Sequence, residues 1–216
     1  MTTSFDYRRA IRIQKVLAGK VLESIEHPVL PGKIKYIAGV DAAYFKGGMI
    51  GAAVLIDYET GLLLEYSIVE KKPPIPYVPG LLAFREAPAY IAAVAKLRRK
   101  PDIIMVDGHG LSHPRGLGIA SHLGLVLDIP SIGIAKKKLY GREVTINGEQ
   151  YIEAHGRIVA RIIEHRNKKL YVSIGYKISL EDAVETTLKM LRPQYNLPLP
   201  IHLADQISKR YARKKK

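Results

Sequence analysis

Two aspartates stand in segments that are otherwise apolar. Asp41 interrupts the stretch 36–44, and Asp107 ends the short apolar run that begins at Ile103. Burying a carboxylate in a strand is costly unless a positive charge or a hydrogen-bond donor compensates it. Asp41 could instead face solvent, and Asp107 could instead cap a loop. Neither residue alone therefore establishes a site.

Glu86 could complete an acidic site with these two aspartates. Carboxylate oxygens favour Mg²⁺ or Mn²⁺ over zinc or copper. Such an ion would offset the repulsion between the acids, neutralise a phosphate and activate water. Cleavage of a phosphodiester with the help of a metal is the chemistry that these acids indicate, provided that the fold brings them together.

A lysine and a glycine-rich segment could serve the same chemistry. Lys136 follows an apolar strand, which could hold it beside a phosphate, although it could equally belong to the basic surface cluster 136–138. The glycines of 108–118 would let the backbone approach a base that has left the stack, or would only shape turns. The histidines at 109, 113 and 122 fit no zinc spacing. His113 is expected to be structural or to contact phosphate.

The charge balance favours a polyanionic partner. Lys and Arg number 34 against 20 Asp and Glu, for a net charge of +14 and a pI near 9.8. Nucleic acid is the commonest such partner, although a basic surface without a specific partner is the plain alternative. The absence of cysteine excludes thiolate chemistry and disulfides. With no secretory signal and no apolar run of membrane length, we expect a soluble, cytoplasmic monomer.

The first half of the chain is expected to hold a helix followed by strands. The helix begins at Ser4 and ends at Gly19, with Ile13, Val16 and Leu17 on one face. Strands are expected over 33–45, 50–58 and 62–70, with a hairpin turn at 58–61. The proline-rich segment 71–80 should be a stiff, exposed loop. Pro88 suits the first turn of a helix that runs to about Arg99, which would place Glu86 at or before its start.

The second half alternates helices and strands. A strand is expected over 102–106, a helix to about 127, a strand over 131–135 and β structure over 143–179, with helices over 180–191 and 201–211. We expect one catalytic domain over 1–216, with a disordered basic tail from about 209. Antiparallel strands followed by alternating elements predict a mixed α/β sheet flanked by helices, and this order resembles the ribonuclease-H-like fold.

Four segments resemble the endonuclease V family, in that family's order and spacing. They are Gly39-Val40-Asp41, the run PYVPGLLAFRE from Pro76 to Glu86, Asp107-Gly108-His109-Gly110 and Gly133-Ile134-Ala135-Lys136. The similarity extends from about residue 5 to 208. Ala83 stands where the family often has serine.

The resemblance implies a ribonuclease-H-like fold and a magnesium-dependent DNA repair endonuclease, with Mn²⁺ as a substitute. Such enzymes recognise deaminated bases, chiefly deoxyinosine, and hydrolyse the second phosphodiester bond on the 3′ side, leaving 3′-hydroxyl and 5′-phosphate ends. By this likeness Asp41 and Asp107 hold the metal and Glu86 completes the acidic cluster. Lys136 contacts the scissile phosphate or the attacking water, and Asp205 supports the active site.

The likeness also indicates how DNA would be bound. Tyr77 would act as a wedge where the damaged base leaves the duplex, although it could instead pack on the core. The other DNA-binding residues implied are Pro76, Pro79, Leu82, Gly108, His113 and Gly118. Inosine-containing RNA is a further substrate to consider. Another nuclease of the same fold, or a basic module that binds nucleic acid without cutting it, are the competing interpretations, and the second leaves the acids unexplained.

Overall fold

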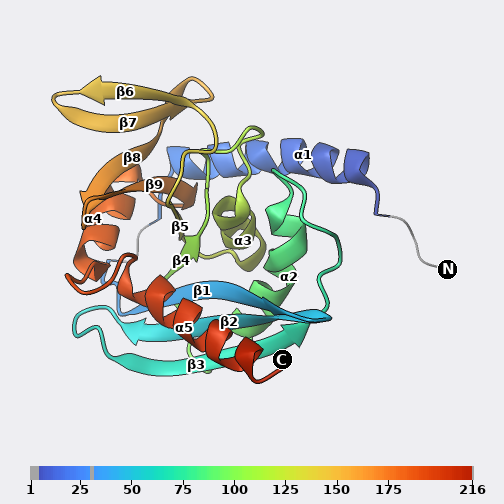
Figure 1. Ribbon diagram of the computed structural model, residues 1–216. Coiled ribbons are helices and arrows are strands. Elements are labelled where there is room, and N and C mark those ends of the chain that lie inside the picture. The colour runs from blue at the N-terminus through green and yellow to red at the C-terminus, as the bar shows by residue number, and fades with distance from the viewer. Residues whose placement is uncertain (1–4, 30–31, 216) are drawn as a thin grey trace.

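A mixed sheet forms the centre of the molecule (Figure 1). The computed structural model describes residues 5–29 and 32–215. Its strands are β1 (Tyr36–Phe45), β2 (Gly48–Asp57), β3 (Leu63–Lys71), β4 (Ile103–Asp107), β5 (Ser131–Ala135), β6 (Arg142–Ile146), β7 (Glu149–Ala154), β8 (Arg157–His165) and β9 (Lys168–Tyr176). They lie side by side in the order β3-β2-β1-β4-β5-β9-β8-β7-β6.

The sheet combines antiparallel and parallel pairs, as the sequence predicts. β1, β2 and β3 form an antiparallel meander, whereas β1, β4 and β5 are parallel neighbours. The remaining strands pair antiparallel. In the turn between β2 and β3, the side chain of Asp57 accepts hydrogen bonds from the backbone of Glu59 and Thr60. The hairpin predicted at 58–61 is therefore confirmed.

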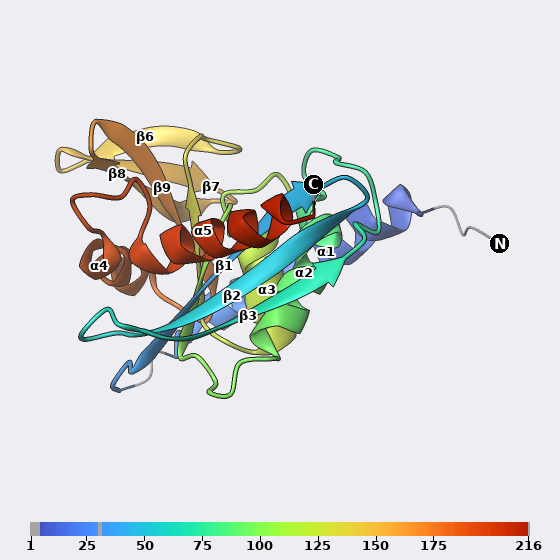
Figure 2. The same cartoon turned by 60° about the horizontal axis from the view of Figure 1, so that its bottom comes forward.

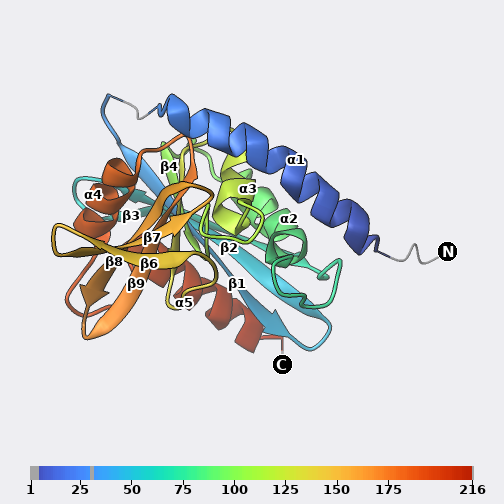
Figure 3. The same ribbon diagram turned by 90° about the horizontal axis from the view of Figure 1, so that it is seen from above.

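Helices cover both faces of the sheet (Figure 3). They are α1 (Tyr7–Glu26), α2 (Leu82–Val94), α3 (Ile119–Leu127), α4 (Leu180–Met190) and α5 (Leu199–Arg213). α2 and α3 pack on one face with α1 beside α3, and α4 and α5 pack on the other. Among the described residues, no helix is long and apolar enough to cross a membrane.

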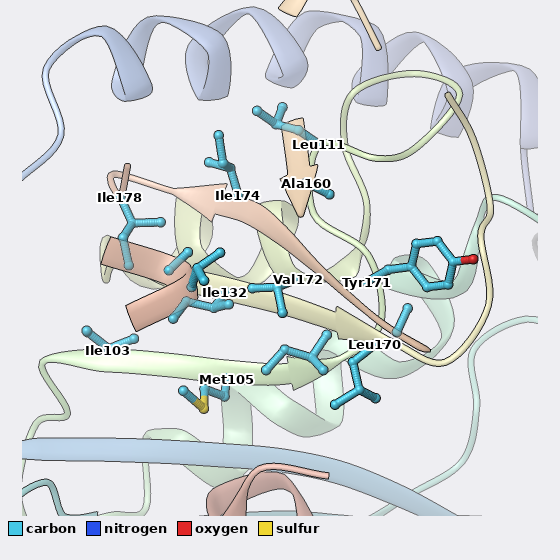
Figure 4. Close-up of a cluster of buried hydrophobic side chains, with 14 of the residues drawn as sticks. Ile103, Met105, Leu111, Ile132, Ala160, Leu170, Tyr171, Val172, Ile174 and Ile178 are labelled. Carbon is cyan, nitrogen blue, oxygen red and sulfur yellow. The ribbon is translucent and has the colours of Figure 1, made fainter. Parts of the chain in front are cut away.

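The side chains of β4 are buried on both faces of the sheet. Ile103 and Met105 belong to one hydrophobic cluster, which Figure 4 shows, and Ile104 and Val106 belong to another beside α2 and α3. Successive side chains of a strand point to opposite faces, so β4 contributes to both clusters. Hydrophobic burial on both sides therefore fixes the position of the aspartate that ends this strand.

The first helix differs from the one expected over 4–19. Its cap is Asp6, whose carboxylate accepts the backbone N–H of Arg9 at 2.9 Å, and Ser4 lies outside the described residues. The helix passes through Gly19, which was expected to end it. Burial of the following turns outweighs the weak helix propensity of a single glycine, since tertiary packing supplies most helix stability.

The buried face of α1 also differs from the expected one. Ile13 and Val16 are exposed, whereas Ala10, Gln14 and Ala18 are buried. The apolar pattern was misleading because a polar residue, Gln14, lies inside the protein and bonds to backbone groups there. A buried amide is tolerated when its hydrogen bonds are satisfied.

The ends of two later helices correct the sequence prediction. α2 begins at Leu82, so Pro88 lies inside the helix and Glu86 is part of it rather than before it. Proline removes one helical hydrogen bond, but the burial of residues such as Tyr90 holds the helix together. α5 continues to Arg213, so most of the basic segment from 209 is helical rather than disordered.

Gly39 lets α5 lie directly on β1 (Figure 2). A Cβ built on this glycine would stand 2.2 Å from the carbonyl carbon and oxygen of Pro200. These atoms are backbone, so they cannot move aside as a flexible side chain could. The absence of a side chain at Gly39 thus sets the distance between the helix and the strand that carries Asp41.

We expect Gly39→Ala to destabilise the protein. Overpacking costs about 1–3 kcal/mol, which corresponds to a loss of about 2–12 °C in Tm for a chain of this size. Thermal unfolding followed by circular dichroism measures this change.

Gly19→Ala is the matched control. A Cβ at Gly19 meets nothing within 4 Å, so this substitution in a helix interior should stabilise by about 0.5–1 kcal/mol. A Gly39→Ala protein that melts at or above the wild-type temperature would show that α5 does not rest on the glycine.

Candidate active site

Asp41 and Asp107 lie next to each other on the adjacent central strands β1 and β4. Val40 pairs with Val106 in the parallel ladder of β1 and β4, and each aspartate is the next residue of its strand. In open α/β sheets, ligands gather beyond the carboxyl ends of the strands. The structure therefore brings together the two acids that the sequence singles out.

Helix α5 brings Asp205 and Ser208 close to this pair of aspartates. The hydroxyl of Ser208, which is fully buried, donates a hydrogen bond of 2.7 Å to Oδ2 of Asp41. Asp205 lies one turn earlier and forms an ion pair of 2.6 Å with Lys209. Residues far apart in the sequence thus meet because α5 packs across β1.

Glu86 reaches the cluster from α2 and is held by two tyrosines. The hydroxyl of Tyr44 donates to Oε1 of Glu86 at 2.6 Å, and that of Tyr90 donates to Oε2 at 2.9 Å. Arg85 in turn donates to the Tyr44 hydroxyl at 2.9 Å. Both carboxylate oxygens are therefore oriented before any ligand binds.

The acids influence one another electrostatically. The pKa of Asp41 is raised to about 7, mainly by burial and to a lesser degree by the charges of Asp205, Asp107 and Glu86, while the hydrogen bond from Ser208 opposes the shift. Burial also raises the pKa of Glu86, with a contribution from Asp107. Four carboxylates thus share one space. Among the described residues, no group of three Asp, Glu or His side chains is arranged closely enough to hold a metal ion as it stands.

Lys136 is the lysine that joins the acids. Its Nζ lies 2.6 Å from Oδ2 of Asp107. The backbone oxygen of Lys137 binds His109 at 2.9 Å, and Lys138 pairs with Glu143 at 3.2 Å. Lys136 is thus an exposed lysine whose ammonium contacts one of the acids, whereas Lys138 pairs with a different carboxylate.

A cavity of about 350 Å³ opens beside the acids. It is lined by Tyr77, Pro79, Leu82, Gly108, His113 and Gly118, together with Gln14, Gly80, Ala83, His109, Leu117, Ile119, Lys137, Lys138 and Leu139. Pro76 is absent from this lining and lies exposed beside Tyr77. Every other residue expected to bind DNA therefore faces one cavity.

The close approach of backbone segments builds one wall of this cavity. A Cβ at Gly118 would lie 2.1 Å from the backbone oxygen of His109 and 2.6 Å from that of Gly110. Only glycine permits this contact. The turn-forming and ligand-facing interpretations of the glycine loop are thus compatible, because the same contact that shapes the loop forms the wall.

The proline-rich loop is anchored at Gly80. Its backbone oxygen accepts hydrogen bonds from Gln14 at 2.9 Å, Arg115 at 2.6 Å and His113 at 3.1 Å. Tyr77, three residues earlier, is 67% exposed. The alternative in which Tyr77 packs on the core is wrong, because the ring projects into solvent from an anchored loop.

The histidines make separate contacts. His113 is buried, and burial together with the charge of Arg115 lowers its pKa to about 4, so the neutral ring donates from Nε2 to Gly80. A structural role fits this position better than a charged contact with phosphate. The ring of His122 stands edge-on to Phe84.

Several supporting residues escape sequence reasoning. Tyr90 lies four residues after Glu86 on one helix face, a spacing that could have revealed it. Tyr44, Ser208 and Gln14 carry no such local signal, because each meets its partner only through the tertiary fold.

The fold and the site define the class first. A mixed sheet with helices on both faces and acids at the ends of neighbouring strands is the arrangement of a ribonuclease-H-like protein. The Endonuclease V family model matches residues 17–206. Endonuclease V of Desulfurococcus amylolyticus is 54% identical over 208 residues, which cover 95% of each chain. The chain belongs to the Endonuclease V family, and it is therefore a nuclease.

Solved structures agree with this assignment. Endonuclease V of Streptomyces avermitilis has a TM-score of 0.87 at 31% identity, covering 98% of this chain and 95% of that one. Endonuclease V of Ciona intestinalis has a TM-score of 0.83 at 25% identity, covering 97% and 98%. That Ciona structure is a complex with a 23mer DNA containing an inosine followed by a ribo-adenosine.

We expect Asp41→Asn to stabilise the protein at pH 8 without divalent cations. The native pKa of Asp41, about 7, lies above the ordinary 3.8, so this residue's contribution to wild-type stability falls as pH rises from about 4 to about 7. One pKa unit corresponds to about 1.36 kcal/mol. Three units set a ceiling of ~4 kcal/mol, and we expect a gain of ~1–2 kcal/mol in urea unfolding with EDTA present.

Asp57→Asn provides the control. Hydrogen bonds from Thr60 hold the pKa of Asp57 below its usual value, so the loss of this carboxylate should lower stability at pH 8. The gain for Asp41→Asn should vanish near pH 4, where the native carboxyl is already protonated. If Asp41→Asn lowers stability at pH 8, or raises it equally at pH 4 and pH 8, then the raised pKa of Asp41 is contradicted.

Proposed function

We propose that this protein is a DNA repair endonuclease that recognises deoxyinosine and hydrolyses the second phosphodiester bond on its 3′ side. The observation that carries this proposal is that the cavity lies directly beside the acidic cluster. Gly108 lines the cavity, and Asp107, the preceding residue, belongs to the acidic cluster. A base held in the cavity would therefore place its own strand beside groups suited to phosphodiester cleavage.

The acidic cluster suits a hard divalent cation. Asp41 and Asp107 would hold Mg²⁺, or Mn²⁺ in its place, since carboxylate oxygens are the ligands these ions prefer. Burial is the main cause of the raised pKa of Asp41, and the charges of Asp205, Asp107 and Glu86 add to it, so a bound cation would favour the ionised carboxylate. When bound, the ion would neutralise phosphate charge and activate water. Glu86 and Asp205 would complete the cluster around it.

The protein's own groups would act on the scissile phosphate. Negative charge collects on the non-bridging oxygens during in-line attack, and the Lys136 ammonium beside Asp107 is placed to oppose it. Tyr44 and Tyr90 keep the carboxylate of Glu86 in a fixed orientation. Fixed groups cost little reorganisation when the transition state forms.

Recognition would divide between the cavity and the exposed loop. The flipped base would enter the cavity and meet backbone groups around Gly108 and Gly118. The exposed ring of Tyr77 would fill the gap that the base leaves. The inosine-containing DNA bound by the Ciona relative supports this substrate class. Since that DNA also carries a ribonucleotide after the inosine, inosine-containing RNA is included in the test below.

The proposal is tested by a nicking assay with magnesium on inosine-containing DNA, inosine-containing RNA and undamaged duplex. We expect cleavage at the second phosphodiester 3′ to inosine in DNA, and none in undamaged DNA. Asp107→Asn should abolish nicking while binding largely survives, because it removes a metal-binding charge. Asp128→Asn, on an exposed residue paired with Lys177, should cut normally. Near-normal cutting by Asp107→Asn at limiting magnesium would show that Asp107 does not bind the metal.

We expect Tyr77→Ala to weaken binding to inosine-containing duplex without lowering the Tm. Stacking of an aromatic ring on a base contributes about 1–3 kcal/mol, which corresponds to a loss of about 5- to 150-fold in affinity. The ring is exposed, so little packing is lost. Fluorescence anisotropy with inosine and undamaged duplexes measures both affinity and discrimination.

Tyr66→Ala is the matched control, because Tyr66 is an exposed tyrosine on the edge strand β3, away from the cavity. It should bind both duplexes normally. If Tyr77→Ala retains wild-type affinity and discrimination, or melts several degrees lower, the wedge role is wrong.

A further inference from the structure

Two arginines on α5 project into solvent without an acidic partner. Arg210 and Arg213 are exposed, and neither forms an ion pair with any residue in 5–29 or 32–215. Their basic neighbours differ, since Lys209 pairs with Asp205 at 2.6 Å and Lys215 pairs with Glu70 at 2.8 Å. The two arginines therefore keep their charge available for an outside partner.

The arginines border a hollow in the surface. It has a volume of about 520 Å³ and is lined by Gln206, Ile207, Lys209, Arg210 and Arg213. All of these residues come from α5, the helix that also supplies Asp205 to the acids. We call this hollow, defined by these five residues, the α5 hollow.

The α5 hollow and the cavity lined by Gly108 border different members of the acidic cluster. The cavity is lined by Gly108, which follows Asp107, whereas the hollow is lined by Gln206, which follows Asp205. The two aspartates both raise the pKa of Asp41, which lies between strand β4 and helix α5. A strand that leaves the cavity and crosses the acids would therefore arrive at the hollow.

The length of the hollow suits several nucleotides. Gln206 and Arg213, the first and last residues of the hollow, are seven residues apart, which is about 10 Å along an α-helix. One strand of B-form DNA advances about 3.4 Å per nucleotide, so this span matches about three steps. Guanidinium groups bind phosphate with two parallel hydrogen bonds, which makes arginine well suited to a nucleic-acid backbone.

The helix dipole offers a simpler reason for cations near the end of α5. Cations in the last turn stabilise a helix by about 0.3–1 kcal/mol. That effect requires neither the hollow nor the lack of an acidic partner at Arg210 and Arg213 among the described residues, so the dipole alone leaves both unexplained.

We propose that the α5 hollow binds backbone phosphates of the cleaved strand on the 3′ side of the scissile bond. The polarity rests on the proposed function, in which the strand runs from the lesion in the cavity toward a cut on its 3′ side. Arg210 and Arg213 contact phosphates there, and Gln206 donates a further hydrogen bond. This contact holds the strand after it passes the acids, so it contributes to binding rather than to the chemical step.

The test is the double substitution Arg210→Gln, Arg213→Gln in the full chain. Its matched control is Arg98→Gln, Lys100→Gln, which removes the same charge from an exposed turn before β4, at the opposite end of that strand from Asp107. Binding is measured in an Asp107→Asn background, so that the DNA stays intact. Inosine duplexes with about twelve or about two base pairs beyond the cut test a hollow that spans about 10 Å, because only the longer flank covers it fully.

We expect the α5 variant to lose about 10-fold or more in affinity for the long 3′ flank and almost nothing for the short one. The slope of log K against log salt should become shallower by about two, since each lost phosphate contact removes about 0.9. The control variant should lose only a little affinity, by the same factor for both 3′ flanks, and its slope of log K against log salt should change little. With Asp107 restored, the single-turnover rate at saturating enzyme should equal that of wild type, and Arg210→Lys, Arg213→Lys should recover most of the salt slope.

Several results would overturn the inference. An α5 variant that behaves as the control does, or that loses affinity equally for both 3′ flanks, shows that the hollow does not hold this part of the strand. A loss that follows the 5′ flank instead reverses the proposed polarity. These outcomes differ from failure of the proposed function, in which the wild-type protein itself does not nick inosine-containing DNA.

Discussion

Desolvation of clustered carboxylates, increased by their mutual repulsion, is the constraint on which the site depends. Asp41, Asp107 and Asp205 share a space in which burial and mutual charge raise the pKa of Asp41 to about 7. Free to move, such groups would turn toward water. They stay together because β1 and β4 are buried at the centre of the sheet and α5 packs across β1. Packing of the hydrophobic core thus offsets the cost of holding Asp41 away from water among other carboxylates.

Hydrogen-bond donors then decide how the assembled acids point. Ser208 fixes one oxygen of Asp41, and Tyr44 and Tyr90 fix both oxygens of Glu86. These donors come from strand, helix and C-terminal helix, so the orientation of the acids depends on the docking of α5 as much as on the sheet. The close contact between Gly39 and Pro200 sets that docking. A helix held this close to the strand leaves the acids little freedom to swing away from one another.

Local signals predict much of this molecule, and long-range contacts explain the rest. The first strands and the hairpin at 58–61 follow from alternation and turn chemistry, whereas the convergence of Asp41 with Asp107 was implied only by the family resemblance. The start of α2 does not follow from local signals, because proline's local preference for a first turn was outweighed by burial along the helix. Gln14 could not be foreseen, since its partner Gly80 is 66 residues away. A residue that acts through a distant partner carries no periodic signal in one sequence.

In the proposed function, recognition and cleavage are coupled through a single peptide bond. Asp107 belongs to the acids and Gly108 to the cavity wall, and both are fixed by β4, which is buried on both faces. A displacement of β4 along the sheet would move the acid and the wall together, so their spacing would persist. The loop that carries Tyr77 is tied to the same unit, because Gly80 accepts hydrogen bonds from α1 and from the segment 113–115, which continues the glycine loop. Both walls of the cavity are therefore held relative to the acids, and a nuclease built in this way would cut at a set distance from the base that it recognises.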